Sequence, residues 1–286
     1  MENHEPAQEI DRRNASIPPL QTPTHSQPLI AGNWKMNGMA AQLREVEVMA
    51  AALKATPPLA DILICLPATL ITHAVQAAAG RLAIGAEDCS AEISGSFTGD
   101  LSAEMLKDAG AEAIIVGHSE RRQHHGETDA IVATKANAAR RAGLLAIICI
   151  GETRAQRLAG NALSVCGEQI AGSVPEGMTA TGTVIGYEPL WAIGSGRMPT
   201  ATQIIAMHAH IRACLINRLG AEGNELRILY GGSVNAPNAA SILALPEVGG
   251  VLVGGASQTA APFLAICRVA LKMASATANA RKEQRR

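Results

Sequence analysis

Eight short apolar runs recur along the chain, and longer segments with helical patterning separate them. Continuous apolar runs of this length are typical of strands that are buried on both faces of a parallel sheet. Their alternation with helices predicts an α/β fold. We expect the strands near residues 29–31, 62–66, 82–85, 113–116, 144–150, 184–187, 226–230 and 251–253.

Three of the intervening segments, 40–54, 128–142 and 200–219, carry apolar stripes beside charged residues, as amphipathic helices do. Eight strand–helix repeats in about 250 residues favour a closed (β/α)8 barrel in a single domain. The alternative is an open, doubly wound sheet. Its usual phosphate-binding signatures are absent from the sequence, which has no G-x-G-x-x-G after the first strand and no G-x-x-x-x-G-K-[ST].

The composition of the 286-residue chain restricts its core and its partners. Hydrophobic residues make up 48% of the chain but aromatic residues only 2%, so the core must be built from aliphatic side chains. The formal net charge is −1 without a basic block, which argues against a nucleic-acid partner. Since no apolar run approaches the roughly 18 residues of a membrane span, no membrane contact is expected either.

Six scattered cysteines form no C-x-x-C pair and have no histidine at metal-ligand spacing. This pattern predicts reduced, mostly buried thiols in a cytoplasmic protein, with neither disulfides nor a metal site. The polar, Pro- and Gln-rich segment 1–27 predicts a disordered extension. Residues 28–275 would form the barrel domain, and residues 276–286 a solvated polar tail.

Two ionisable residues come directly after apolar runs, His118 after the fourth and Glu188 after the sixth. In a barrel both would lie at the carboxyl ends of the strands, where this fold places catalytic residues. An imidazole and a carboxylate are a common pair for moving protons at neutral pH. Ser119 and Glu120 begin a helix whose dipole predicts a lowered pKa and a neutral ring for His118. Glu120 either orients this site or stabilises its own helix as a first-turn acid.

Further polar residues follow the first, seventh and eighth runs. Lys35 would bring a positive charge to the same edge, unless its stem simply packs along the strand end. Gly231-Gly232-Ser233 and Gly254-Gly255 follow the last two runs, where barrel enzymes bind phosphate through backbone N–H groups. Ordinary turns also contain Gly-Gly pairs. Together with the acid–base pair, these residues predict a site for a small phosphorylated substrate.

The loop after Glu188 combines a rigid proline with flexible glycines, which predicts a lid that is stiff at one end. Trp191 and Ile193 would cover Glu188, and the loss of water would raise the pKa of its carboxyl. An ordinary surface loop is the alternative, but it would expose both apolar side chains. The lid residues are Pro189, Leu190, Trp191, Ala192, Ile193, Gly194, Ser195 and Gly196.

Five separated motifs occur in the order found in the triosephosphate isomerase family, which the chain resembles from about residue 28 to 274. Each motif alone is modestly specific, whereas all five in order are very specific. The resemblance implies a TIM barrel that interconverts dihydroxyacetone phosphate and D-glyceraldehyde 3-phosphate through an enediolate; this family is a standard example of a glutamate base beside a neutral histidine. The motifs are Asn33-Trp34-Lys35-Met36-Asn37, Gly117-His118-Ser119-Glu120-Arg121-Arg122, Tyr187-Glu188-Pro189 with Trp191, Tyr230-Gly231-Gly232-Ser233 and Val253-Gly254-Gly255-Ala256-Ser257.

The same resemblance assigns a role to each site residue. Glu188 would shuttle the proton between carbons, and His118 would stabilise the enediolate. Lys35, with Asn33 beside it, would supply positive charge near the substrate oxygens, and Ser119 and Glu120 would support the site. The closed lid would keep the enediolate from losing phosphate, and no metal or organic cofactor is implied. The phosphate would be held by Gly194, Ser233, Gly254 and Gly255.

The resemblance also implies a homodimer, in which the loop from Glu87 to Asp100 after the third strand reaches into the partner. Glu87 departs from the family pattern, because many members carry a glutamine there. The additional carboxylate changes the local contacts expected beside the interface.

Two other functions would use the same residues. An isomerase of the same fold that acts on a tetrulose phosphate would need the same base, histidine and phosphate site. A barrel that only binds a phosphorylated metabolite is a rival from another class. Phosphate binding alone needs none of Glu188, His118 and Lys35, so the sequence favours the triosephosphate isomerase.

Overall fold

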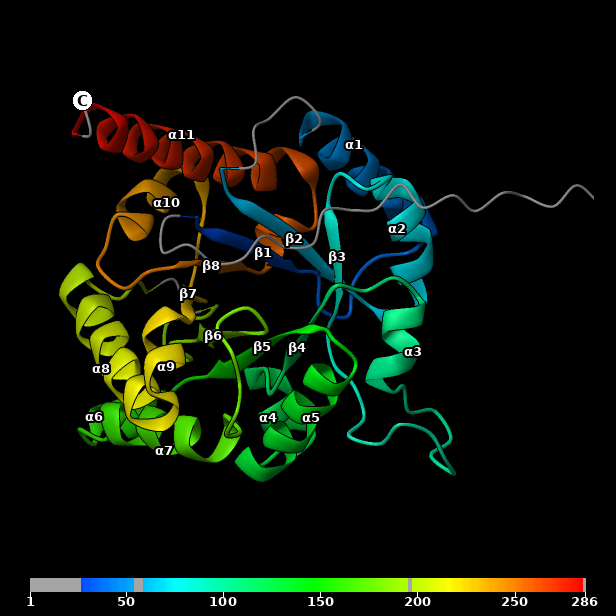
Figure 1. The fold of residues 1–286 in the computed structure, drawn as a ribbon, viewed down its shortest axis with the longest axis horizontal. Helices are drawn as coiled ribbons and strands as arrows, with labels where there is room; N and C mark the ends of the chain where they lie inside the picture. Colours follow the sequence, from blue (N-terminus) through cyan, green and yellow to red (C-terminus); the bar gives the residue numbers. More distant parts are fainter. Residues whose placement is uncertain (1–26, 54–58, 195–196, 285–286) are drawn as a thin grey trace, which may run out of the picture.

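The computed structural model describes residues 27–53, 59–194 and 197–284. Its eight parallel strands close into a barrel in the order in which they occur along the chain (Figure 1). All eight predicted strands are confirmed. They are β1 (Leu29–Asn33), β2 (Asp61–Leu66), β3 (Ala83–Ala86), β4 (Ala113–Val116), β5 (Leu145–Ile150), β6 (Thr183–Tyr187), β7 (Arg227–Tyr230) and β8 (Gly250–Val253).

The pairing of the first and last strands closes the sheet. In β1, Leu29 is in register with Asp61 of β2 on one side and with Gly250 of β8 on the other. The open sheet, which was the alternative expected from the sequence, is therefore excluded. The carboxyl ends of all eight strands meet at one end of the barrel, because every pairing is parallel.

Helices surround the barrel on its outside (Figure 1). Short 3₁₀ turns at Ala40–Gln42 (η1), Ala68–Leu70 (η2) and Gly255–Ser257 (η3) add to them. The three predicted helices are confirmed as α1 with η1, α5 and α8. The helices are α1 (Leu43–Leu53), α2 (Ile71–Ala78), α3 (Ala103–Asp108), α4 (Ser119–His124), α5 (Asp129–Arg141), α6 (Arg154–Leu158), α7 (Ala162–Ser173), α8 (Ala201–Leu219), α9 (Ala221–Glu225), α10 (Ala236–Leu243) and α11 (Ala260–Gln284).

The two ends of the chain differ in how far the structure describes them. Residues 1–26, which make up nearly all of the predicted extension, lie outside the described residues. At the other end, α11 continues as a helix to Gln284, so the predicted boundary at residue 275 does not coincide with the end of this helix. The last part of α11 is rich in Ala, Arg, Lys, Glu and Gln, which are strong helix formers, and holds no Gly or Pro.

The apolar core has two layers, as the alternation of side chains along a strand requires. Within β1, Leu29 and Ala31 point into the barrel, whereas Ile30 packs outward against the helices. The inner layer consists of small and aliphatic side chains, in agreement with the low aromatic content. Its members are Leu29, Ala31, Leu63, Cys65, Ala83, Ala113, Ile115, Leu145, Ile147, Cys149, Val184, Leu229 and Leu252.

Among the residues that the structure describes, no helix combines the length and the apolar character needed to cross a bilayer.

Candidate active site

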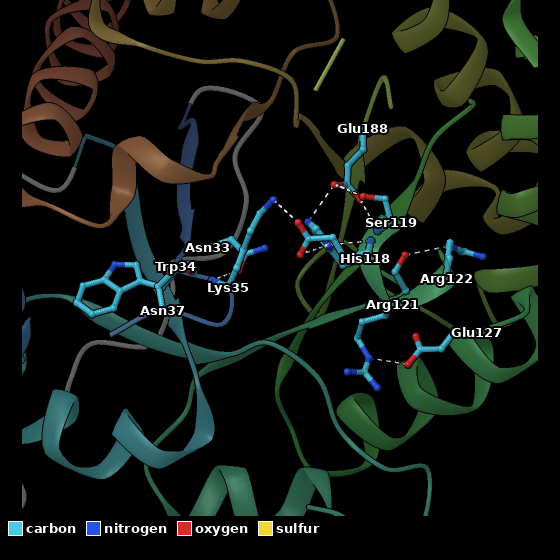
Figure 2. A network of polar contacts seen from close by, with 12 residues as sticks. Asn33, Trp34, Lys35, Asn37, His118, Ser119, Arg121, Arg122, Glu127 and Glu188 are labelled. Atoms are coloured by element: carbon cyan, nitrogen blue, oxygen red, sulfur yellow. Dashed lines mark hydrogen bonds and ion pairs between the residues drawn. The ribbon is translucent and has the colours of Figure 1, made fainter. Parts of the chain in front are cut away.

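Glu188 and His118 meet at the carboxyl end of the barrel, and their side chains point toward one another (Figure 2). Glu188 follows β6 and His118 follows β4. The Glu188 Oε1 atom lies 3.0 Å from His118 Nε2, and both residues are buried. Ser119 donates its backbone N–H to Glu188 Oε2 at 3.0 Å and its hydroxyl to Oε1 at 3.0 Å. The carboxylate is thus held by three donors at the start of α4.

These donors decide the protonation of Glu188. Burial raises the pKa of its carboxyl, but His118 and Ser119 lower it by a larger amount, so the pKa lies below its ordinary value. The rise expected from the sequence is therefore wrong for this arrangement, because three hydrogen bonds to the charged form outweigh the loss of water. Glu188 is therefore held as an ionised carboxylate in this arrangement.

The pKa of His118 also differs from the expectation. Burial lowers it, but the carboxylates of Glu188 and Glu120 raise it by more, and the net shift is upward. The predicted lowering is wrong here, because the helix dipole is weaker than a carboxylate in direct contact. The Glu120 N–H nevertheless donates to His118 Nδ1 at 3.3 Å, which requires a lone pair on that nitrogen. This bond favours the neutral ring with its proton on Nε2.

Lys35 extends from the end of β1 toward the same site. Its backbone is left-handed, with φ 58°, a conformation that non-glycine residues seldom adopt outside tight turns and functional sites. Asn33 supports this turn by accepting the Lys35 N–H on its side-chain oxygen at 3.0 Å. The Lys35 ammonium contacts Glu120 Oε1 at 2.6 Å, so the predicted alternative of a lysine that only packs along the strand does not apply.

The glycine loops after β7 and β8 share one cavity with these residues. The cavity has a volume of about 290 Å³ and brings together the predicted catalytic and phosphate-binding residues. A Cβ added to Gly255 would meet no atom within 4 Å, so its Cα faces open space. Trp34 links the loop after β1 to the loop after β8, because its indole N–H donates to the Ser257 carbonyl at 2.8 Å. The lining includes Asn33, Lys35, His118, Glu188, Ile193, Gly194, Ser233, Gly254 and Gly255.

The two apolar residues of the predicted lid point in different directions. Ile193 lines the cavity together with Glu188. Trp191 instead donates its indole N–H to Glu152 Oε1 at 2.8 Å, and its ring stacks on the Arg157 guanidinium at 4.5 Å. The expectation that Trp191 covers Glu188 is wrong for this arrangement, because a buried carboxylate and a cation bind the indole elsewhere. Ser195 and Gly196 lie outside the described residues.

Glu152 is a functional candidate that the sequence reasoning missed. It is fully buried, and its Oε1 accepts hydrogen bonds from Trp191, the Tyr187 hydroxyl at 3.2 Å and Arg157 at 2.8 Å. Glu152 comes two residues after β5, so the rule that singled out His118 and Glu188 could have found it. It anchors the first part of the lid to the barrel.

The described residues contain no cluster of three or more His, Cys, Asp or Glu side chains that could hold a metal ion. The groups at this end of the barrel are a carboxylate, an imidazole, an ammonium group and backbone amides. Proton transfer on a small anionic substrate is the chemistry that they can perform, which places the chain among the barrel enzymes that act on phosphorylated metabolites.

Comparison with known proteins gives the particular family. The sequence model of triosephosphate isomerase matches residues 28–270, so the chain belongs to the triosephosphate isomerase family. The triosephosphate isomerase of Rhodopseudomonas palustris is 59% identical over 242 residues, covering 83% of this chain and 95% of the relative. That of Hyphomonas neptunium is 58% identical, covering 85% and 98%. A crystal structure of the Bartonella henselae enzyme superposes with a TM-score of 0.79 at 45% identity, covering 85% of this chain and 98% of that one.

This membership decides among the three functions that the sequence left open. The chain is an isomerase that interconverts dihydroxyacetone phosphate and D-glyceraldehyde 3-phosphate by proton transfer. A preference for a tetrulose phosphate and a purely binding role are both disfavoured, because the relatives are named for the triose reaction.

Proposed function

We propose that Glu188 is the base of this reaction. Its carboxylate removes a proton from C1 of dihydroxyacetone phosphate and returns it to C2 of the enediolate, which gives glyceraldehyde 3-phosphate. The observation that carries the proposal is the position of the buried, ionised carboxylate on the wall of the cavity that the glycine loops also line, 3.0 Å from His118. Proton transfer by a positioned carboxylate contributes about 10²- to 10⁴-fold to a rate.

His118 and Lys35 stabilise the negative charge that develops on the substrate oxygens. The Nε2–H of a neutral His118 donates to the carbonyl oxygen and then moves protons between the two oxygens of the enediolate. The Lys35 ammonium supplies a positive charge to the same cavity, which Lys35 lines beside Gly254, its Cε lying 3.8 Å from a Cβ built on that glycine. Asn33 keeps Lys35 in its left-handed turn, and Ser119 and Glu120 orient the acid–base pair.

The phosphate of the substrate binds to the backbone amides of the glycine loops. Ser233 follows β7, and Gly254 and Gly255 lie at the start of η3, so their N–H groups can face an anion. Gly194 reaches the same cavity from the lid. Closure of the lid over the bound phosphate would exclude water and keep the enediolate from eliminating phosphate.

Replacing the base tests this assignment. Glu188→Gln keeps the shape of the side chain but removes the proton acceptor, so the kcat for glyceraldehyde 3-phosphate in a coupled assay should fall by about 10³-fold. Inorganic phosphate should still inhibit the residual activity with an unchanged constant, because the glycine loops are intact. Turnover at the wild-type rate in this variant would refute the assignment of the base.

We also propose that two copies of the chain form a homodimer through the loop from Glu87 to Asp100. A second, wider cavity of about 930 Å³ lies beside this loop. Asn33, Lys35 and His118 line both this cavity and the active site, so a partner seated there would reach the catalytic residues. Met36 and Phe97 on its rim are 96% and 47% exposed, and burial in an interface would remove this apolar surface from water.

A cytoplasmic location is our third proposal. All six cysteines are free thiols, five of them buried, which suits a reducing compartment. Fractionation of the host cell with an antibody against the chain would test it, and recovery in an oxidising compartment would contradict it.

A further inference from the structure

Gly151, directly after β5, supports the backbone of Glu188. A Cβ added to Gly151 would lie 1.9 Å from the Glu188 carbonyl oxygen and 2.7 Å from Leu190 Cδ1. The neighbouring Ile150 carbonyl accepts the Glu188 N–H at 2.8 Å. The end of β5 therefore contacts both polar atoms of the Glu188 backbone, at the point where the lid begins.

A single side chain outside the active site holds Gly151 in this place. Gln169 of α7 accepts the Gly151 N–H on Oε1 at 2.7 Å and donates its Nε2–H to the Gly151 carbonyl at 3.1 Å. A primary amide is suited to this task, because it offers one donor and one acceptor side by side. Without Gln169, both backbone groups would lose their partners, and an unsatisfied buried group is costly.

The helix that carries Gln169 is itself fixed to the barrel. Cys166, Ile170 and Ser173 form the buried face of α7. Arg122 links this face to β5, because its Nη2 donates both to the Ser173 hydroxyl at 2.9 Å and to the Cys149 carbonyl at 3.1 Å. Gln169 therefore projects from a helix whose position relative to the end of β5 is set by these contacts.

We propose that Gln169 is a positioning residue for the isomerisation, because it clamps Gly151 and thereby fixes the backbone of Glu188. The next residue in the clamped segment is Glu152, which anchors Trp191 of the lid. The side-chain amide of Gln169 thus fixes both Glu188, the proposed base, and the proline end of the lid. The inference rests on the proposed role of Glu188, since a misplaced carboxylate matters only if it takes the proton.

The step that should respond to the clamp is proton abstraction. A displacement of about 1 Å in a reacting group can reduce a rate by about 10²-fold. The phosphate site lies on the loops after β7 and β8, whereas Gln169 makes its two hydrogen bonds to Gly151 after β5, so substrate binding should respond much less. A lower kcat with an unchanged KM is the pattern expected when only the transition state is affected.

Gln169→Met tests the proposal, because methionine has a similar length but makes neither hydrogen bond to Gly151. We expect kcat for dihydroxyacetone phosphate to fall by about 10- to 100-fold, with KM and inhibition by inorganic phosphate within about 2-fold of the wild type. The kinetic isotope effect on kcat with substrate deuterated at C1 should rise, since proton abstraction becomes more rate-limiting. Glu168→Gln, an exposed change on the same helix, serves as the control and should leave all four quantities unchanged.

A second variant separates the proposed effect from a loss of activity caused by misfolding. Gln169→Glu retains the acceptor for the Gly151 N–H but not the donor for its carbonyl, so it should fold and show a smaller loss of kcat. A folded variant of either kind with wild-type kcat would overturn the proposal. So would a lower kcat with an unchanged isotope effect, because inactive molecules alone would explain it. If Glu188→Gln is inactive while the Gln169 variants are normal, only the positioning role fails; if Glu188→Gln is active, the assignment of the base fails.

Discussion

The pKa values of Glu188 and His118 depend more on the contact between the two side chains than on their burial. Burial alone would raise the pKa of the carboxyl and lower that of the imidazole, because it penalises the charged form of each. At 3.0 Å each group stabilises the charged form of the other, so the pKa of Glu188 is lowered and that of His118 is raised. A substrate that separates the pair would reverse both shifts. It would make Glu188 a stronger base and His118 a neutral donor when both are needed.

This coupling predicts how His118 titrates. In Glu188→Gln the carboxylate that raises the pKa of His118 is gone and burial remains, so the pKa should fall relative to the wild type. NMR titration of the ring would measure it. His208, which burial holds at a pKa of about 4 in α8, is a control whose titration should not change. An unchanged or higher pKa of His118 would contradict the coupling.

Glu87, the departure from the family pattern, has a consequence for stability. Burial, reinforced by the Glu120 carboxylate, raises its pKa to about 8 against the opposing effect of Lys35, and its Oε1 has no hydrogen-bond partner among the described residues. Because the pKa of Glu87 is higher in the folded than in the unfolded chain, the protonated carboxyl contributes its full stability below the ordinary pKa of 4.5. This contribution is lost as the pH rises toward 8.

Glu87→Gln should therefore stabilise the chain at alkaline pH. The neutral amide has the same shape and avoids the cost of protonating the carboxyl, so the free energy of unfolding should rise by on the order of 3 kcal/mol at pH 8. The gain should be much smaller at pH 5, where the wild-type carboxyl is already protonated. Denaturant unfolding at both pH values would measure it, and an equal gain at both would show that charge is not the cause.

At the scale of elements, Glu152 joins β5, β6, α6 and the lid. Its three donors come from Tyr187 at the end of β6, Arg157 in α6 and Trp191 in the lid. Because all three converge on one buried oxygen, the lid is held to the barrel at its proline end. Closure over a phosphate would have to rearrange the Trp191 contacts.

This arrangement makes Trp191 a reporter of the lid. Saturating inorganic phosphate should change the tryptophan emission, because the indole would leave Glu152 and the Arg157 guanidinium. The only other tryptophan, Trp34, is 1% exposed and supplies the background. In Trp191→Phe the phosphate-dependent change should disappear while the Trp34 emission remains. Persistence of the change in that variant would assign it to Trp34 and contradict the movement of the lid.

Some features of these elements could be predicted from the sequence, and others could not. The eight strands were predictable, because fully buried strands need continuous apolar runs. The positions of His118 and Glu188 at the carboxyl end of the barrel were predictable too, because both residues closely follow such runs. The partner of Trp191 was not, since Glu152 is 39 residues away in the sequence and the choice between covering Glu188 and binding Glu152 depends on side-chain contacts between elements. The shifted pKa values were missed for the same reason.

At the scale of the whole molecule, the dimer proposal predicts a mass. The full chain should behave in light scattering as a particle of twice the 29.6 kDa of one chain. Phe97→Asp places a charge in the proposed interface, so it should increase the monomer fraction and lower kcat. Leu158→Asp, at a 77% exposed apolar residue in α6, is the matched control and should change neither. A Phe97→Asp variant that stays dimeric and active would contradict this interface.

The central claim is that Glu188 carries the proton between the two carbons of the substrate, and solvent exchange tests it most directly. Dihydroxyacetone phosphate in D₂O should acquire deuterium at C1 in the presence of the wild-type chain, which proton NMR detects without a coupling enzyme. In Glu188→Gln this exchange should slow by about 10³-fold while inorganic phosphate still binds. Exchange at the wild-type rate in Glu188→Gln would contradict the account.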